Sequence, residues 1–356
     1  MTPHDATILQ GNALELAHTL APLSIDNVTC SPPYLAKRDY PCEPTYWPGD
    51  DECHHEWTVA GPLRTRTEAD KGGNAKVSDE GENYNALSSK LCSKCGAWVG
   101  KLGGEPTPDL YIDHLIQILA AIRPALKDSG TIFLNLGDTR ATHPAGVEGE
   151  RRWRMSGLLK GPLGSQGRRN RQGEEQAGRY DKRFPGYQEK CLIGVPWLFA
   201  FAAMRDGWFL RNAIIWAKHP KPERVQDRLT DSYEFIFVLT KKARYYWNYE
   251  EARKIRTEDH PGADGNLLDV WNIRPENGST GHLAPYPLEI PHRCIRLGCP
   301  KDGMVLDPFA GSGTTLVAAQ KWGARSIGFE LSEKDHAKAR SRAHLDCRRL
   351  DGFVEA

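Results

Sequence analysis

The chain has 356 residues and a nearly balanced charge, with 47 lysines and arginines against 46 aspartates and glutamates. Its length allows a substantial core, but its charge excludes a strong overall attraction to nucleic acid, so such a partner would need a local basic patch. The nine cysteines, an odd number, argue against a secreted disulfide scaffold. Without a leader or a run of about 18 apolar residues, we expect a cytoplasmic protein with no membrane anchor.

The first segment predicts a strand, a helix and a second strand. Residues 6–9 and 25–30 are short apolar strands, and a helix covers roughly residues 13–20. Asn12 and Ala13 follow the first strand, at the carboxyl edge where open α/β sheets bind ligands. We therefore expect an α/β fold with a ligand site at this edge.

A stiff corner follows the second strand. It consists of Ser31, Pro32, Pro33 and Tyr34, which supply a hydroxyl, two fixed φ angles and an aromatic ring. Because the prolines lack an N–H, the corner is rich in carbonyls that can accept hydrogen bonds. It predicts the floor of a site for a flat group with an amino substituent, although the same residues also form inert turns.

Residues 35–108 form an insertion that is too long and irregular for an ordinary loop. Its Cys-x-x-Cys-Gly motif is typical of a zinc knuckle. The predicted zinc ligands are Cys53, His55, Cys92 and Cys95. His54 and Cys42 are alternative ligands, and reduced surface cysteines are the alternative to a metal site. Four protein ligands leave no open position, so the predicted zinc is structural.

The next segment predicts a helix over residues 109–128 and a strand over residues 131–136. Asp138 then either contacts substrate or caps a turn. An irregular region follows, residues 140–191, which is rich in arginine, glycine and aromatic residues. Its arginines suit phosphates and guanine edges, so we expect contacts to DNA, with a solvated loop as the alternative. The candidate residues are Arg151, Arg152, Arg154, Arg168, Arg169 and Arg171.

Regular structure resumes with a helix over residues 196–204 and strands over residues 208–216 and 233–240. The proline-rich segment between these strands carries Lys218 and Lys221, which we predict to line a substrate cleft and contact DNA. Residues 250–280 read as a mostly polar connection. A helix over residues 288–297 follows.

A second ligand turn lies near the other end of the chain. A strand ends at Asp307, a glycine-rich turn opens a helix over residues 315–322, and the next strand ends at Glu330. In such βαβ units the glycines admit a ligand and the second acid holds ribose hydroxyls. The turn lacks the Gly-Lys-Ser/Thr of a phosphate loop, and its leading acid suits an ammonium group. S-adenosylmethionine carries both an ammonium and a ribose.

Together the two turns resemble those of the amino-methyltransferases of DNA, specifically the circularly permuted β class. In that family an Asp-Pro-Phe-x-Gly-Ser-Gly-Thr turn binds S-adenosylmethionine, and a Ser/Asp-Pro-Pro-Tyr turn, which comes first in the chain, holds the target base. The resemblance implies a Rossmann-like α/β fold with a seven-stranded mixed sheet. The catalytic domain would comprise residues 1–34, 109–139 and 192–356, with residues 35–108 as the zinc-knuckle insertion and 140–191 as the target-recognition region.

The resemblance also implies the cofactor contacts. Asp307 would meet the amino group of the cofactor, Phe309 and Gly311 would pack along it, and Glu330 would hold the ribose. Asn12 stands where the family commonly has aspartate, so it keeps an acceptor without the charge. The implied cofactor-binding residues are Asn12, Ala13, Pro287, Asp307, Pro308, Phe309, Gly311, Ser312, Gly313, Thr314 and Glu330.

For the reaction, serine at the head of the first turn is the pattern of family members that methylate N4 of cytosine. The Ser31 hydroxyl and the Pro32 carbonyl would accept the amino hydrogens, and Tyr34 would stack on a base flipped out of the double-stranded DNA. N6-adenine methylation, a DNA-binding protein without turnover, and methylation of protein or metabolites are the alternatives. A homodimer and a cognate restriction endonuclease are implied partners in a bacterium, archaeon or phage.

Overall fold

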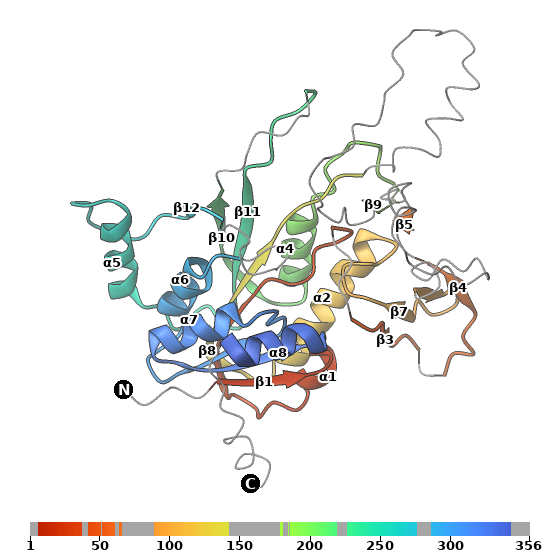
Figure 1. Ribbon diagram of the computed structural model, residues 1–356, viewed down its shortest axis with the longest axis horizontal. Coiled ribbons are helices and arrows are strands. Elements are labelled where there is room, and N and C mark those ends of the chain that lie inside the picture. The colour runs from red at the N-terminus through yellow and green to blue at the C-terminus, as the bar shows by residue number, and fades with distance from the viewer. Residues whose placement is uncertain are drawn as a thin grey trace.

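The computed structural model describes residues 6–37, 42–50, 52–60, 64–65, 89–141, 179–180, 184, 186–218, 226–275 and 286–342. The predicted DNA contacts from Arg151 to Arg171 and at Lys221 lie outside these residues. An eight-stranded mixed sheet in the order β1-β14-β13-β2-β8-β11-β10-β12 is the centre of the fold (Figure 1). Its strands are β1 (Ala6–Gln10), β2 (Ile25–Cys30), β8 (Leu126–Leu136), β10 (Phe209–Ala217), β11 (Tyr233–Thr240), β12 (Val270–Asn272), β13 (Met304–Asp307) and β14 (Arg325–Glu330).

The sheet is parallel from β1 to β8, and β11 is antiparallel to both of its neighbours, β8 and β10. The predicted mixed sheet is confirmed, and β12 makes it one strand wider than the predicted seven. β2 and β13 are adjacent although they lie at opposite ends of the chain. All six residues of β2 are buried, as expected for a central parallel strand covered on both faces.

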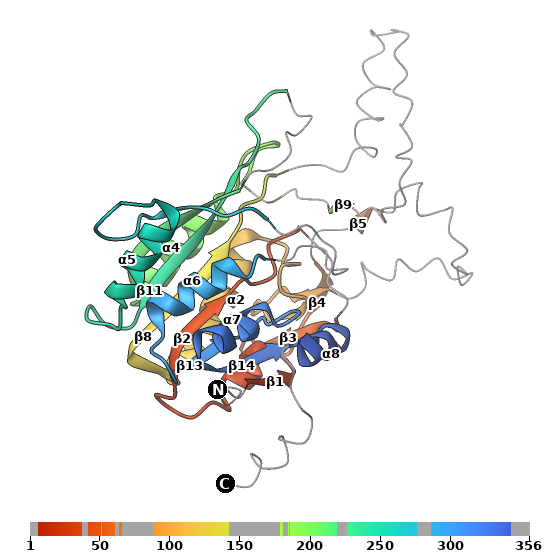
Figure 2. The ribbon, with the colours of Figure 1, turned by 60° about the vertical axis from the view of Figure 1, so that its left-hand side comes forward.

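Helices cover both faces of the sheet (Figure 2). On one face α1 (Ala13–Ala17), α2 (Pro108–Ile122) and α4 (Val195–Arg205) pack in one core cluster. On the other face lie α5 (Tyr249–Asp259), α6 (Glu289–Gly298), α7 (Thr314–Trp322) and α8 (Glu333–Arg342). The buried apolar side chains of α2 recur at helical spacing, which explains why this helix was predicted from the sequence.

Two predictions about these elements are wrong. The helix predicted over residues 109–128 ends at Ile122, because Pro124 has no N–H to continue it, and Leu126 already pairs with Ile25 in the sheet. The connection predicted over residues 250–280 contains α5. This helix was missed because its buried residues include only two apolar ones, while its carboxylates pair with Arg296 of α6.

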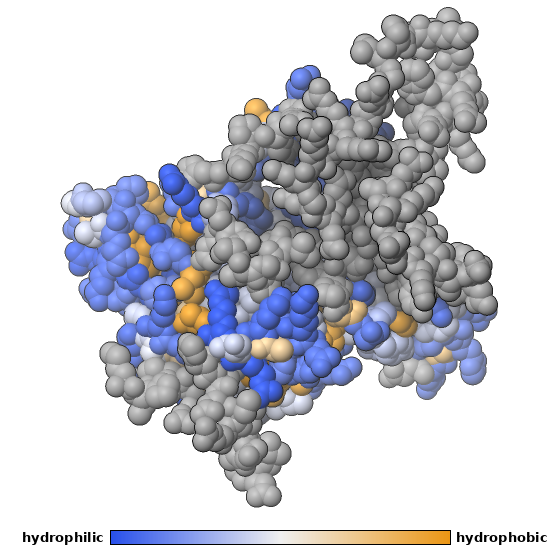
Figure 3. Space-filling view, in the orientation of Figure 1, coloured by the Kyte–Doolittle hydropathy of each residue, from blue (hydrophilic) through white to orange (hydrophobic). Residues whose placement is uncertain are grey.

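The described part of the insertion forms a second, smaller sheet beside α2 (Figure 1). Its four antiparallel strands, in the order β3-β7-β6-β4, are β3 (Thr45–Trp47), β7 (Trp98–Gly100), β6 (Lys90–Cys92) and β4 (Trp57–Val59). A short ladder joins β5 (Arg64–Thr65) to β9 (Arg179–Tyr180). Hydrophilic residues cover most of the described surface in Figure 3. Within the described ranges, no helix has the length and apolar character to cross a membrane.

Candidate active site

The two predicted turns lie side by side. β2 and β13 are parallel neighbours, with Asn27 opposite Val305 and Val28 opposite Leu306, so both strands end at the same edge of the sheet. The turns that follow them line one cavity of 840 Å³. This volume is within the range of small-molecule sites. Segments far apart in the sequence therefore form one candidate site.

Most of the predicted site residues line this cavity. They are Ser31, Pro32, Pro33, Tyr34, Asn12, Ala13, Asp307, Pro308, Phe309, Gly311, Ser312, Thr314 and Glu330, together with Lys218. Two predicted cofactor residues, Pro287 and Gly313, are not among its lining residues. Gly313 has φ +81°, and a Cβ there would lie 3.1 Å from the Ala339 side chain, so it shapes the turn before α7.

The half of the cavity beyond β13 carries two acidic groups. Asp307 is 3% exposed and accepts a hydrogen bond from the Phe309 N–H at 3.0 Å. Burial raises the pKa of Asp307 to about 7. Glu330 accepts hydrogen bonds from the N–H groups of Gly311 (2.8 Å) and Ser332 (2.7 Å), and burial raises its pKa too. The backbone thus holds both carboxyl groups in place.

Asn12 lies at the edge of the same half of the cavity. Its Oδ1 accepts a hydrogen bond from the Leu14 N–H at 2.9 Å and caps α1. A cap of this kind satisfies one of the free N–H groups at a helix start. The amide oxygen therefore has a local structural role beside its predicted role in cofactor binding.

The other half of the cavity centres on Tyr34. Its hydroxyl lies 2.8 Å from Oε2 of Glu234 and 2.9 Å from Oδ1 of Asn135, and Ser31 Oγ lies 3.4 Å from the same Oδ1. Lys218 forms an ion pair with the other oxygen of Glu234. Burial, and then the charge of Glu234, raise the pKa of Tyr34 well above its usual value. The phenol therefore stays protonated and donates.

The sequence analysis missed Asn135 and Glu234. Both line the cavity, and both belong to strands that were otherwise predicted. Glu234 is a charged residue in an apolar strand, at the end where that strand starts. Because β11 is antiparallel, its start lies at the edge where the parallel strands end. This signal could have indicated Glu234 once the direction of β11 was known.

Close backbone approach supports the position of the Tyr34 ring. A Cβ at Gly137 would lie 2.7 Å from the ring, so a larger residue there would displace it. On the other side, the hydroxyl of Tyr111 donates a hydrogen bond to the Pro33 carbonyl at 2.7 Å. The turn is thereby held from β8 and from α2.

Two polar residues near the cavity have structural roles. Cys30 is 1% exposed, and burial raises the pKa of its thiol well above the usual value, so it packs in the strand and is unsuited to be a nucleophile. Asp138 accepts hydrogen bonds from the N–H groups of Thr139, Gly194 and Val195 at the start of α4. Of its two predicted roles, the structure shows the turn cap.

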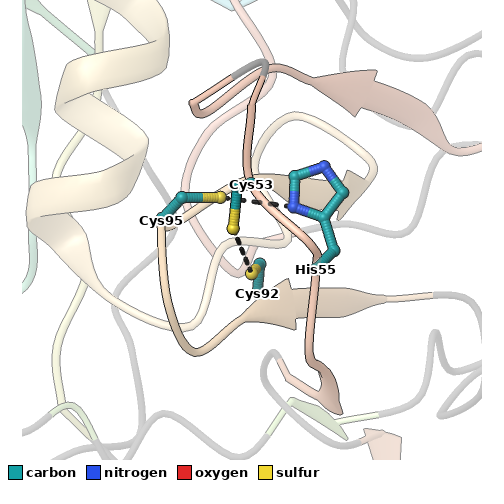
Figure 4. Close-up of side chains that lie close together, drawn as sticks. All are labelled: Cys53, His55, Cys92 and Cys95. Carbon is teal, nitrogen blue, oxygen red and sulfur yellow. Dashed lines mark hydrogen bonds between the residues drawn. The ribbon is translucent and has the colours of Figure 1, made fainter.

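The four predicted zinc ligands point toward one another (Figure 4). Their ligand atoms all lie within 4.8 Å of each other, with Cys53 Sγ 3.9 Å from Cys92 Sγ and His55 Nδ1 3.4 Å from Cys95 Sγ. Tetrahedral zinc with ordinary bond lengths places two sulfur ligands about 3.8 Å apart and a sulfur and a nitrogen about 3.5 Å apart. The spacing therefore fits a zinc ion at the centre of the cluster.

Local backbone geometry explains the cluster. Cys92 ends β6, Cys95 lies in the turn to β7, and Gly96 closes that turn with φ +76° and an N–H bond to the Cys92 carbonyl. Glycine suits this conformation because it has no Cβ. Of the alternative ligands, His54 is exposed and Cys42 lines the large cavity, and neither belongs to the cluster.

The open α/β sheet with a two-part site at its carboxyl edge defines the class of methyltransferase folds. The model of the DNA methylase family N6_N4_Mtase matches residues 25–340, so the chain belongs to this family. The predicted family is thereby confirmed, and the protein is a DNA methyltransferase.

Curated relatives are type II methyltransferases. The chain is 37% identical to M.SmaI of Serratia marcescens over 68% of this chain and 77% of that protein. It is 30% identical to M.Cfr9I of Citrobacter freundii over 92% of this chain and 84% of that protein.

Two solved structures share the fold. PvuII DNA methyltransferase (cytosine-N4-specific) has a TM-score of 0.57 at 14% identity, covering 97% of this chain and 88% of that one. The DNA modification methylase TTHA0409 of Thermus thermophilus, complexed with S-adenosyl-L-methionine, has a TM-score of 0.51 at 19% identity, covering 98% and 96%. These likenesses confirm the predicted fold.

Proposed function

We propose that the protein transfers a methyl group from S-adenosylmethionine to N4 of cytosine in double-stranded DNA. The observation that carries the proposal is the single cavity lined by both turns, with carboxyl groups at one end and a hydroxyl, carbonyls and an aromatic ring at the other. This arrangement suits two ligands that meet between the turns.

The carboxyl end fits the cofactor. The Asp307 carboxylate would accept the ammonium group, and Glu330, whose oxygens each have a lone pair beyond their backbone bonds, would accept ribose hydroxyls. Gly311, with φ +52°, keeps the turn open for close approach. When bound, S-adenosylmethionine supplies a methyl group on a sulfonium. The fold shared with the cofactor-complexed TTHA0409 supports this assignment.

The other end fits an amino group on a flat ring. The lone pair of such a group is delocalised into the ring, so it is a poor nucleophile. The Ser31 hydroxyl and the Pro32 carbonyl would accept its hydrogens and direct its lone pair at the methyl group, while Tyr34 stacks on the ring. Catalysis would come chiefly from positioning, and the base must leave the duplex to reach this site.

Cytosine is favoured over adenine by Ser31 at the head of the turn. The PvuII enzyme with a similar fold is named as cytosine-N4-specific, which agrees with this choice. The N6-adenine alternative uses the same kind of amino group. We also assign Lys218 to the base end of the cavity, because it pairs with Glu234 there, and leave the DNA backbone to the arginine-rich region. The homodimer and the restriction endonuclease stay predictions.

Transfer of label tests the proposed activity. Unmethylated DNA of varied sequence, incubated with the protein and S-adenosylmethionine labelled in its methyl group, is expected to acquire label that stays with the DNA after protease treatment. A protein-only control separates self-methylation. Unlabelled DNA from a sample that binds the cofactor would refute the enzymatic proposal.

The pKa of Asp307 predicts how cofactor affinity depends on pH. Because this pKa is about 7, the carboxyl of the free protein gains a proton as the pH falls through 7, whereas the ammonium of the cofactor prefers the carboxylate. Affinity should therefore fall about tenfold between pH 7.5 and pH 6. Calorimetric titrations at both pH values measure it. In Asp307→Asn the dependence should disappear, and an equal dependence in the variant would contradict this origin.

We propose that Cys53, His55, Cys92 and Cys95 hold a structural zinc ion. Protein purified without chelator should contain one zinc per chain by elemental analysis. Cys92→Ser should lose the metal and lower the Tm by about 5 °C or more, since metal binding contributes to folding. Cys191→Ser, which changes an exposed cysteine outside the cluster, is the matched control. Metal-free wild-type protein would overturn the ligand assignment.

A further inference from the structure

A line of buried contacts joins the metal cluster to the turn at Ser31. The cluster fastens the segment before β4 to the turn between β6 and β7. A Cβ at Gly49 would lie 2.7 Å from Cys95 Sγ, so the segment after β3 also packs on a ligand. A metal here would hold the strands of the small sheet in register.

The small sheet grips one side chain of α2. The indole of Trp47 on β3 stacks on the ring of His114, with ring centroids 4.0 Å apart, and Trp98 on β7 stacks at 5.1 Å. Trp47 and Trp98 are 2% and 0% exposed, respectively, and the His114 side chain is 2% exposed. Both tryptophans belong to strands of the sheet that carries the cluster. The orientation of His114 is therefore set by this sheet.

His114 in turn holds a buried carboxyl group. Its Nδ1 lies 2.9 Å from Oε1 of Glu105, and Oε2 of Glu105 accepts a hydrogen bond from the Gly103 N–H at 2.8 Å. The Glu105 side chain is fully buried. A buried polar group of this kind is stable only while its partners stay in place. The carboxyl group thus couples the backbone at Gly103 to α2.

Gly103 lies against the turn that we assign to the base. Its carbonyl accepts a hydrogen bond from the Ala36 N–H at 2.7 Å, and a Cβ on Gly103 would lie 3.0 Å from the Tyr34 carbonyl. With φ +89°, the position favours glycine. The contacts therefore run from the cluster through the stacked rings and the carboxyl group to the backbone of Tyr34.

We propose that the metal-bound sheet is a clamp that positions the Ser31–Tyr34 turn for catalysis, with His114 and Glu105 as positioning residues. The inference rests on the proposed function, in which that turn holds the base. The clamp touches neither Asp307 nor Glu330. Loosening it should affect the transfer step and leave cofactor binding intact.

Replacing Glu105 tests the clamp. Glu105→Ala should keep the zinc content and leave the Kd of S-adenosylmethionine within about twofold, while kcat falls about tenfold or more, because small misplacements of reacting groups are costly. Glu105→Gln, which retains an acceptor for the Gly103 N–H, should restore most of the rate. Glu56→Ala in the same small domain, at an exposed side chain, is the control and should behave as wild type. A wild-type kcat in Glu105→Ala would overturn the clamp.

A second variant covers the case in which Glu105→Ala fails to fold. His114→Phe keeps a ring between the two tryptophans but cannot bond to Glu105, and it should show the same loss of kcat with unchanged cofactor affinity. A parallel loss of kcat and cofactor affinity in a folded variant would mean that these residues only stabilise the fold, which contradicts the clamp.

Amide hydrogen exchange separates the clamp from the proposed activity. Exchange in the segment that includes Ala36 should accelerate in Glu105→Ala and in zinc-stripped protein, and stay unchanged in the Glu56→Ala control. If wild-type protein transfers no methyl group to DNA but exchange accelerates as expected, the proposed function fails and the clamp stands. Unchanged exchange in both samples would refute the clamp.

Discussion

Replacing Asp307 by asparagine is expected to weaken the binding of S-adenosylmethionine by more than about a hundredfold. Asparagine keeps the shape of the side chain and can still accept the hydrogen bond from the Phe309 N–H, but it removes the negative charge. The side chain is 3% exposed, so water cannot replace that charge at the ammonium group. Leaving one member of a buried ion pair uncompensated costs about 3–5 kcal/mol, which corresponds to more than two orders of magnitude in Kd.

Calorimetric titration of the cofactor into wild-type and variant protein measures this loss. Asp264→Asn is a matched control, because it makes the same chemical change at an exposed side chain far from the cavity. Its Kd should equal that of the wild type. Equal affinities in Asp307→Asn and in wild-type protein would show that Asp307 does not meet the ammonium group.

Truncating Tyr34 to alanine should slow methyl transfer about a hundredfold or more without changing cofactor affinity. The ring is the stacking surface that we assign to the flipped base, and its hydroxyl bonds to Glu234 and Asn135, which hold it in place. Without the ring, the amino group is no longer fixed in line with the methyl group. Tyr34→Phe keeps the ring and removes only the hydroxyl bonds, so it should lose less of the rate.

Single-turnover transfer to DNA at saturating cofactor measures the Tyr34 effect directly. Tyr249→Ala removes a half-exposed tyrosine of α5 and should transfer at the wild-type rate. If Tyr34→Ala transferred as fast as the control, the turn would not be the base-holding floor.

The site could be predicted as far as it is encoded locally. Each of the two turns directly follows a strand, and the residues that point into the cavity lie within a few positions of each other, as do Cys92 and Cys95 of the knuckle. Such short motifs constrain the backbone by proline, glycine and hydrogen bonds, and these constraints are visible in sequence. The adjacency of β2 and β13 was expected because the resemblance supplied the order of the strands.

Long-range contacts could not be predicted in this way. Glu234 reaches Tyr34 because β11 runs antiparallel beside β8, which no local pattern specifies. Glu105 and His114 read as ordinary polar residues of a loop and a helix, and only the burial between Trp47 and Trp98 makes them a pair. Sheet order and tertiary packing decide these contacts.

The identity of the methylated base tests the central claim most directly. Unmethylated DNA is incubated with purified protein and S-adenosylmethionine, digested to nucleosides and analysed by mass spectrometry beside standards of each methylated nucleoside. We expect N4-methylcytosine from wild-type protein and little or none from Asp307→Asn or Tyr34→Ala at equal concentration. N6-methyladenine as the product would contradict the assignment of the Ser31 turn to cytosine.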